Sequence, residues 1–98
     1  MKTFDGKIVI VTGGNSGIGA AAALQFAREG AKIVIAARRK DESEAVVRQI
    51  EAFGSEGLFL KTDVTKRTDI EELVEGTLAR FRRLDCAVNN AGIAGPVL

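Results

Sequence analysis

The sequence contains no histidine, tyrosine or tryptophan, and it has one cysteine and one proline among 98 residues. Because Cys86 has no partner within the chain, an internal disulfide framework is excluded and a reducing compartment is expected. The apolar runs are too short to span a membrane or to form a signal peptide. The net charge is +1, so no overall field favours nucleic acid or a membrane surface as a partner. We therefore predict a cytoplasmic protein without a nucleic-acid partner, a membrane segment or a metal site.

Short β-branched runs alternate along the chain with longer amphipathic segments. This pattern predicts buried strands at 7–11, 32–37, 58–60 and 86–88, and helices at 18–29, 41–53 and 65–81. Gly30 and Gly54 follow the first two helices, where glycine favours helix termination. The start of the third helix is left open, because both Thr65 and the capping box Thr68-x-x-Glu71 fit its N-terminus. The stripe of the third helix that we expect to face the core comprises Ile70, Leu73, Val74, Thr77, Leu78 and Phe81.

The alternation predicts an α/β fold, namely the first half of a three-layer, doubly wound parallel sheet of the Rossmann type. Right-handed crossovers through three helices place the strands in the order 3-2-1-4. The strand at 86–88 then lies at an edge, although it carries no charge of the kind that usually protects an edge. We therefore expect residues 1–98 to be the N-terminal part of a single nucleotide-binding domain, with further strands supplied by the rest of a longer chain or by a partner.

A glycine-rich turn, Thr12-Gly13-Gly14-Asn15-Ser16-Gly17-Ile18-Gly19, joins the first predicted strand to the first predicted helix. A Walker A loop would need lysine after its second glycine, but Ala20 stands at that position. The dinucleotide pattern G-x-G-x-x-A fits residues 17–22, yet its first glycine would lie unusually far beyond the strand. A turn that binds nothing is the remaining alternative.

We prefer the pattern T-G-x-x-x-G-x-G, which places its first glycine directly after the strand. In this interpretation Gly13 makes the tight bend, Gly17 lets a pyrophosphate approach the backbone, and Gly19 lets the helix pack closely on the strand. The helix N-terminus adds unpaired N–H groups and a partial positive charge. The turn is therefore predicted to bind a dinucleotide.

Two further patterns follow later strands, namely Asp63-Val64 after the third and Asn89-Asn90-Ala91-Gly92 after the fourth. All three patterns stand at carboxyl ends of strands, which line the crevice where such sheets bind ligands. Through these patterns the sequence resembles the N-terminal portion of the short-chain dehydrogenases/reductases over essentially its whole length.

The resemblance implies contacts to a nicotinamide cofactor: Ser16, Gly17 and Ile18 at the pyrophosphate and ribose, Asp63 at the adenine amino group with the Val64 backbone beside it, and Asn90, Ala91 and Gly92 at the nicotinamide-side ribose. The complete set of predicted cofactor-binding residues is Gly13, Asn15, Ser16, Gly17, Ile18, Gly19, Arg38, Arg39, Asp63, Val64, Asn90, Ala91 and Gly92. The alternatives to these cofactor contacts are purely structural. Asp63 would then only cap a turn, and Asn89 and Asn90 would only be turn residues.

The end of the second predicted strand bears on the choice between the two nicotinamide cofactors. NAD-binding domains carry an acidic residue about 20 residues beyond the glycine pattern, which binds the ribose 2′-hydroxyl. Ala37 stands at that position, and Arg38 and Arg39 follow it. A guanidinium binds a phosphate bidentately, so we predict NADP(H), with Arg38 as the principal ligand, Arg39 as the secondary one, and NAD(H) as the alternative cofactor. The competing interpretation is a solvated basic tip that includes Lys40.

Members of the resembled family transfer a proton with a tyrosine, assisted by lysine, serine and asparagine, all downstream of the N-N-A-G pattern. This chain has no tyrosine and ends six residues after Gly92, so we predict no catalytic residue within it and no turnover by these residues alone. The resemblance implies an NADP(H)-dependent carbonyl reductase or alcohol dehydrogenase that acts on a small carbonyl or alcohol substrate and forms dimers or tetramers. The alternative is a non-catalytic nucleotide-binding module.

Overall fold

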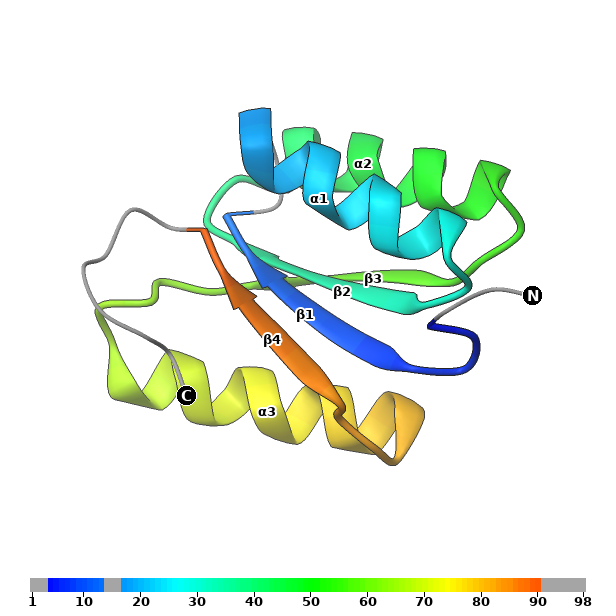
Figure 1. Ribbon diagram of the computed structural model, residues 1–98. Helices are drawn as coiled ribbons and strands as arrows, with labels where there is room; N and C mark the ends of the chain where they lie inside the picture. The colour runs from blue at the N-terminus through cyan, green and yellow to red at the C-terminus, as the bar shows by residue number, and fades with distance from the viewer. Residues whose placement is uncertain (1–3, 14–16, 91–98) are drawn as a thin grey trace.

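The computed structural model describes residues 4–13 and 17–90. Its elements are β1 (Ile8–Thr12), α1 (Gly17–Arg28), β2 (Lys32–Ala37), α2 (Lys40–Ala52), β3 (Gly57–Lys61), α3 (Arg67–Phe81) and β4 (Cys86–Asn89). The four strands are parallel and lie in the order β3-β2-β1-β4, which confirms the predicted topology. Helices α1 and α2 cover one face of the sheet and α3 covers the other, giving three layers (Figure 1).

The central strands are apolar on both faces because both faces are covered by helices. Val9, Val11, Ile33 and Ile35 belong to the larger buried cluster, together with residues of α1 and α2. The intervening positions of the same strands, including Ile10 and Val34, belong to the second cluster, on the side of α3. The period of two along each strand thus divides the core into two layers. Ala23 and Ala27 are buried on α1, where small side chains let the helix lie close to the sheet.

Most predicted boundaries hold to within a residue, but the third helix begins later than expected. Both proposed caps of this helix were wrong, because Lys66 is its N-cap residue and no side chain caps it. The Thr65 hydroxyl donates to the Asp63 carboxylate instead of accepting from the helix. Local side-chain bonds of this kind compete with capping, and here they delay the start of α3 to Arg67.

Helix α3 buries less of its predicted stripe than expected. Leu73 and Thr77 are buried, whereas Ile70 is 40% exposed and Leu78 is 44% exposed. The physical reason is that α3 alone covers its face within the described residues, so the flanks of the stripe extend beyond the contact with the sheet (Figure 1). In residues 4–13 and 17–90, none of the helices has the length and apolar character needed to cross a membrane.

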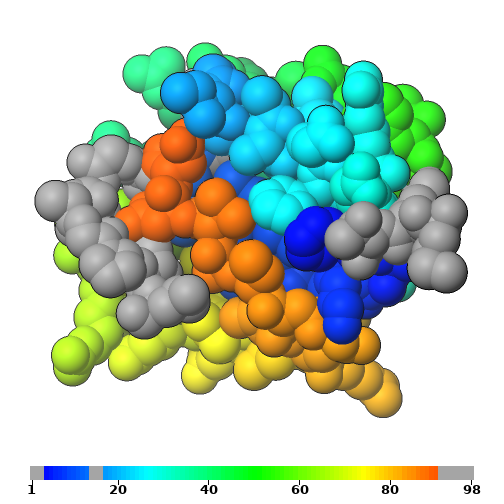
Figure 2. Space-filling model, viewed as in Figure 1, coloured from blue at the N-terminus to red at the C-terminus, as the bar shows by residue number. Residues whose placement is uncertain are grey.

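Strand β4 lies at an edge of the described sheet, as predicted. Figure 2 shows its atoms at the surface, between α1 above and α3 below. Cys86, which we expected to be a buried strand residue, is half-buried because the strand has a described neighbour on one side only. Asp85 fastens the start of this strand to β1, because its Oδ2 accepts the Ile8 N–H at 2.8 Å. Its Oδ1 forms an ion pair with Arg83 at 2.6 Å.

The Asp85 carboxylate makes stability depend on pH. The ion pair with the Arg83 guanidinium, followed by the Ile8 N–H bond, holds the pKa of Asp85 below its ordinary value. The ionised group therefore stabilises the fold above the unfolded-state pKa of about 3.9, and this contribution is lost as pH falls through the lower, folded-state pKa. We expect Asp85→Asn to lower the urea midpoint at pH 7, with the difference from the wild type shrinking toward about pH 2. A difference that is constant over this range would contradict the assignment.

Candidate nucleotide-binding site

The carboxyl ends of the four strands are joined to one another by backbone hydrogen bonds. These bonds run from Gly13 N–H to Ala36 O at 2.8 Å, from Thr62 N–H to Ala37 O at 2.9 Å, and from Asn90 N–H to Thr12 O at 3.2 Å. Each strand is followed within two residues by a predicted cofactor residue, namely Gly13, Arg38, Asp63 and Asn90. The fold therefore brings these four positions, which are far apart in the sequence, to the same end of the sheet, where all four strands have their carboxyl ends (Figure 1).

The glycines of the turn between β1 and α1 have different steric surroundings. Gly13 and Gly17 adopt positive φ angles of 67° and 59°, which side-chain-bearing residues rarely adopt. A Cβ on Gly19 would overlap the carbonyl oxygen of Gly13 and lie 2.8 Å from Asn90 Nδ2. Within residues 4–13 and 17–90, a Cβ on Gly17 would have no heavy atom within 4 Å other than its chain neighbours and its own helix backbone. Gly19 is thus required for internal packing, whereas the described part of the chain leaves the space beside Gly17 open.

The first turn of α1 is suited to a negatively charged group. It contains no acidic side chain, and its N-terminal N–H groups carry the partial positive charge of the helix dipole. Ile18, in this same turn, is 79% exposed. Four of the predicted cofactor residues, Asn15, Ser16, Ala91 and Gly92, lie outside the described residues.

Thr12 connects the glycine turn to β4, a role that the sequence analysis missed. Its side chain is buried, and its hydroxyl donates toward Asn89 Oδ1 at 3.0 Å and Val88 O at 3.2 Å. The same hydroxyl oxygen accepts the Asn90 N–H at 3.0 Å. Thr12 is the last residue of β1 rather than the first of the turn, which places its hydroxyl beside β4. Asn90 is therefore fixed next to Gly19 through a residue on a different strand.

The end of β2 carries exposed positive charge beside the N-terminus of α2. Ala37 is the last residue of the strand and is 7% exposed, while Arg38 and Arg39 are exposed. Arg39 is the N-cap residue of α2, with extended backbone, and its own side chain makes no capping hydrogen bond to the helix. Asp41 and Glu42 in the first turn oppose part of the positive charge. A shallow hollow of about 380 Å³ is lined by Arg39, Lys40, Asp41 and Glu42.

The Asp63 carboxylate is held in place and ionised. Its Oδ1 accepts the Thr65 hydroxyl at 2.6 Å and the Thr65 backbone N–H at 3.0 Å. These two bonds, with smaller contributions from the charges of Arg38 and Lys66, hold the pKa of Asp63 below its ordinary value. The carboxylate is therefore a hydrogen-bond acceptor at neutral pH. Val64, the next predicted residue, is half-buried.

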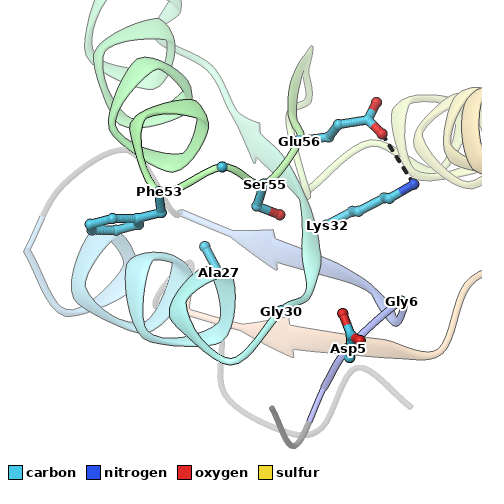
Figure 3. Close-up of a pocket in the computed structure, with 9 residues that line it drawn as sticks. Asp5, Gly6, Ala27, Gly30, Lys32, Phe53, Ser55 and Glu56 are labelled. Atoms are coloured by element: carbon cyan, nitrogen blue, oxygen red, sulfur yellow. Dashed lines mark ion pairs between the residues drawn. The ribbon is translucent and has the colours of Figure 1, made fainter. Parts of the chain in front are cut away.

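Another hollow, of about 220 Å³, lies at the opposite, amino-terminal end of the sheet (Figure 3). Lys32 and Glu56 form an ion pair at 3.1 Å on one side of it, and the Phe53 ring lies on the other. Both charged side chains are close to half-exposed to solvent, which screens their attraction, so this pair contributes little to stability. The lining includes none of the predicted cofactor residues, so this hollow is separate from the candidate site.

Comparison with known proteins shows the family. The family model described as short chain dehydrogenase matches residues 7–98. An uncharacterized oxidoreductase of Listeria monocytogenes is 48% identical over 91 residues, which are 93% of this chain and 37% of that protein. The apo structure of glucose dehydrogenase from Caenorhabditis elegans has a TM-score of 0.86 at 40% identity, over 95% of this chain and 40% of that one. A 3-ketoacyl-(acyl-carrier-protein) reductase from Brucella melitensis, complexed with NADH, has a TM-score of 0.85 at 38% identity, over 93% of this chain and 36% of that one.

The chain thus spans less than half the length of these relatives, and what it shares with them is the part described above. The match includes the glycine turn and the carboxyl ends of all four strands. Because this match extends over residues 7–98, the chain belongs to the short chain dehydrogenase family of oxidoreductases.

Proposed function

We propose that the chain is the cofactor-binding part of an NADP(H)-dependent oxidoreductase that reduces a small carbonyl compound or oxidises the corresponding alcohol. The observation that carries this proposal is the open space beside Gly17, at the N-terminus of a helix without acidic residues in its first turn. Bare backbone at this corner leaves room for a diphosphate, and the helix N-terminus attracts it.

The residues at the carboxyl ends of the strands fit the remaining parts of such a cofactor. The glycine turn, including Asn15, Ser16 and Ile18, would hold the pyrophosphate and its ribose. Asp63 is an ionised acceptor, which suits the adenine amino group, with Val64 beside it. Asn90, together with Ala91 and Gly92, would lie at the nicotinamide-side ribose. When bound, the cofactor supplies or accepts the hydride, and the chain's own residues bind and orient it.

A preference for the 2′-phosphate is supported by the end of β2. Ala37 carries no carboxylate that would repel a phosphate, and the Arg38 and Arg39 guanidinium groups are exposed beside it. The N-terminus of α2, whose N-cap residue makes no side-chain cap, adds the partial positive charge of its N–H groups at the same place. These features favour NADP(H) over NAD(H), although Asp41 and Glu42 reduce the net charge of the hollow.

The proton-transferring residues belong, in this proposal, to the part of the family fold that the 98 residues do not span. The chain has no tyrosine, so these residues alone are not expected to catalyse turnover. We further propose a cytoplasmic protein that forms dimers or tetramers.

Replacement of Arg38 by alanine tests the cofactor preference. Loss of a hydrogen bond to a charged group costs about 1.5–3 kcal/mol, so we expect NADPH to bind about 10- to 150-fold more weakly. NADH, which lacks the 2′-phosphate, should bind with little change. The measurement is a fluorescence titration with each reduced cofactor, and Arg48→Ala, which removes an equal charge from an exposed position on α2, is the matched control. Equal, small changes for both cofactors would overturn the assignment of Arg38.

A further inference from the structure

The two carboxylate oxygens of Asp63 have different surroundings. Both donors of Thr65, its hydroxyl and its backbone N–H, bind the same oxygen, Oδ1. In the described part of the chain, Oδ2 of Asp63 takes part in no hydrogen bond or ion pair. The carboxylate is therefore anchored through one oxygen and presents the other as a single acceptor.

The backbone of Asp63 is held from a second direction. Its N–H donates to Oδ2 of Asp69 at 2.9 Å, and Asp69 is a half-buried residue in the first turn of α3. The Asp63 carbonyl oxygen in turn accepts the Lys66 N–H at 2.9 Å. Because both the main chain and one carboxylate oxygen have partners, rotation of the carboxylate would break short hydrogen bonds.

These bonds do not serve to cap the helix. The N-cap residue of α3 is Lys66, and the Asp69 side chain points its oxygen at an N–H that lies before the helix. Thr65 likewise donates its hydroxyl proton and does not accept from α3. What the arrangement fixes is the position of the Asp63 carboxylate at the carboxyl end of β3.

We propose that Thr65 and Asp69 are positioning residues that hold Asp63 so that Oδ2 accepts the 6-amino group of a purine, which selects aminopurine over 6-oxopurine cofactors. This inference rests on the proposed function. An ionised carboxylate can only accept hydrogen bonds, so it pairs with an amino group, whereas a 6-oxo group presents a second acceptor and is repelled. Anchoring strengthens the discrimination because less rotational freedom of the carboxylate is lost when the ligand binds.

The test compares NADPH with reduced nicotinamide hypoxanthine dinucleotide phosphate, which differs from it in having a 6-oxo group in place of the amino group. The quantity measured is the affinity ratio, defined as the affinity for NADPH divided by the affinity for this analogue. We expect Thr65→Val to reduce the affinity ratio about 3- to 10-fold, a loss of the size of one hydrogen bond. Thr65→Ser keeps the hydroxyl and should keep the ratio. Asp69→Ala should reduce the ratio in the same direction.

Asp63→Asn distinguishes recognition of adenine by Asp63 from the positioning roles of Thr65 and Asp69. An amide can either donate or accept, so this variant should reduce the affinity ratio by at least about tenfold. If it does so while Thr65→Val and Asp69→Ala leave the ratio unchanged, Asp63 recognises adenine without help and the positioning roles are wrong. If Asp63→Asn leaves the ratio unchanged, the adenine assignment in the proposed function is wrong, and the positioning roles fail with it.

Discussion

Replacement of Gly19 by alanine is expected to lower the free energy of unfolding by about 3 kcal/mol, the upper end of the usual cost of overpacking. The new methyl group would overlap the Gly13 carbonyl oxygen and lie 2.8 Å from Asn90 Nδ2. The first of these neighbours is backbone at a tight turn and has no alternative rotamer. Either α1 must move away from the turn or the turn must separate from β4. The measurement is urea unfolding followed by circular dichroism.

Gly17→Ala is the matched control for this variant, because it adds the same methyl group two residues earlier in the same turn. Among the residues that the structure describes, only its own helix and chain neighbours would meet that group, so we expect the cost to come from the positive φ of 59° and to be about 1 kcal/mol. The folded Gly17→Ala protein should nevertheless lose NADPH binding, since the methyl group takes the space assigned to the pyrophosphate. Equal destabilisation by the two variants would contradict the steric distinction between these glycines.

Thr12→Val is expected to lower the free energy of unfolding by about 2 kcal/mol. Valine has nearly the shape of threonine, so the loss comes from the hydroxyl, which accepts the Asn90 N–H and donates to Asn89 Oδ1. The Asn90 N–H would keep only its longer bond, of 3.2 Å, to the Thr12 carbonyl oxygen. The change should appear as a lower urea midpoint without a change in the slope of the transition.

Thr77→Val provides the comparison for Thr12→Val. Thr77 is also buried, but its hydroxyl makes a single hydrogen bond, within its own helix. That hydroxyl donates at 2.8 Å to the carbonyl of Leu73, four residues earlier in the same helix. A carbonyl in the middle of a helix is normally paired with a backbone N–H. Removal of the Thr77 hydroxyl therefore leaves this carbonyl with its backbone hydrogen bond. The variant should therefore change stability by less than about 1 kcal/mol. If both threonine variants behaved alike, the connection between β1 and β4 would not depend on the Thr12 hydroxyl.

The sequence alone predicted the topology because the patterns that determine it are local. Residues 32–37 were predicted as a buried strand, and β2 has these bounds. Glycines after the first two helices were predicted as terminators, and Gly30 and Gly54 have positive φ angles of 96° and 87°. Period-two and period-3.6 patterns can be recognised without knowledge of the fold, and the crossover rule then gives the order of strands.

The features that the sequence did not predict depend on contacts between distant residues. Thr12 was assigned to the glycine turn, because its bonds to β4 join residues about 77 positions apart. The Thr65 hydroxyl had a readable signal, since a threonine two residues after an aspartate is a common local hydrogen-bonding pair, but helix capping was the competing interpretation. The exposure of Cys86 and Leu78 could not be predicted, because it depends on which neighbours cover them in space.

The pairing of β1 with β4 has a consequence for the order of assembly. β1 and β2 are joined through a single helix, whereas the Ile8–Asp85 bond that helps to hold β4 against β1 closes a loop of 77 residues. Such distant pairings are slow to form, because the entropy of loop closure is lost before the contacts are gained. The pairing of β4 with β1, and with it the placement of Asn90, should thus form last, after the helix-linked strands have assembled. A folding intermediate that contains only β1, β2 and β3 would have the glycine turn but would lack Asn90, which we propose lies at the nicotinamide-side ribose. We therefore expect full affinity for the proposed cofactor only after the final folding step.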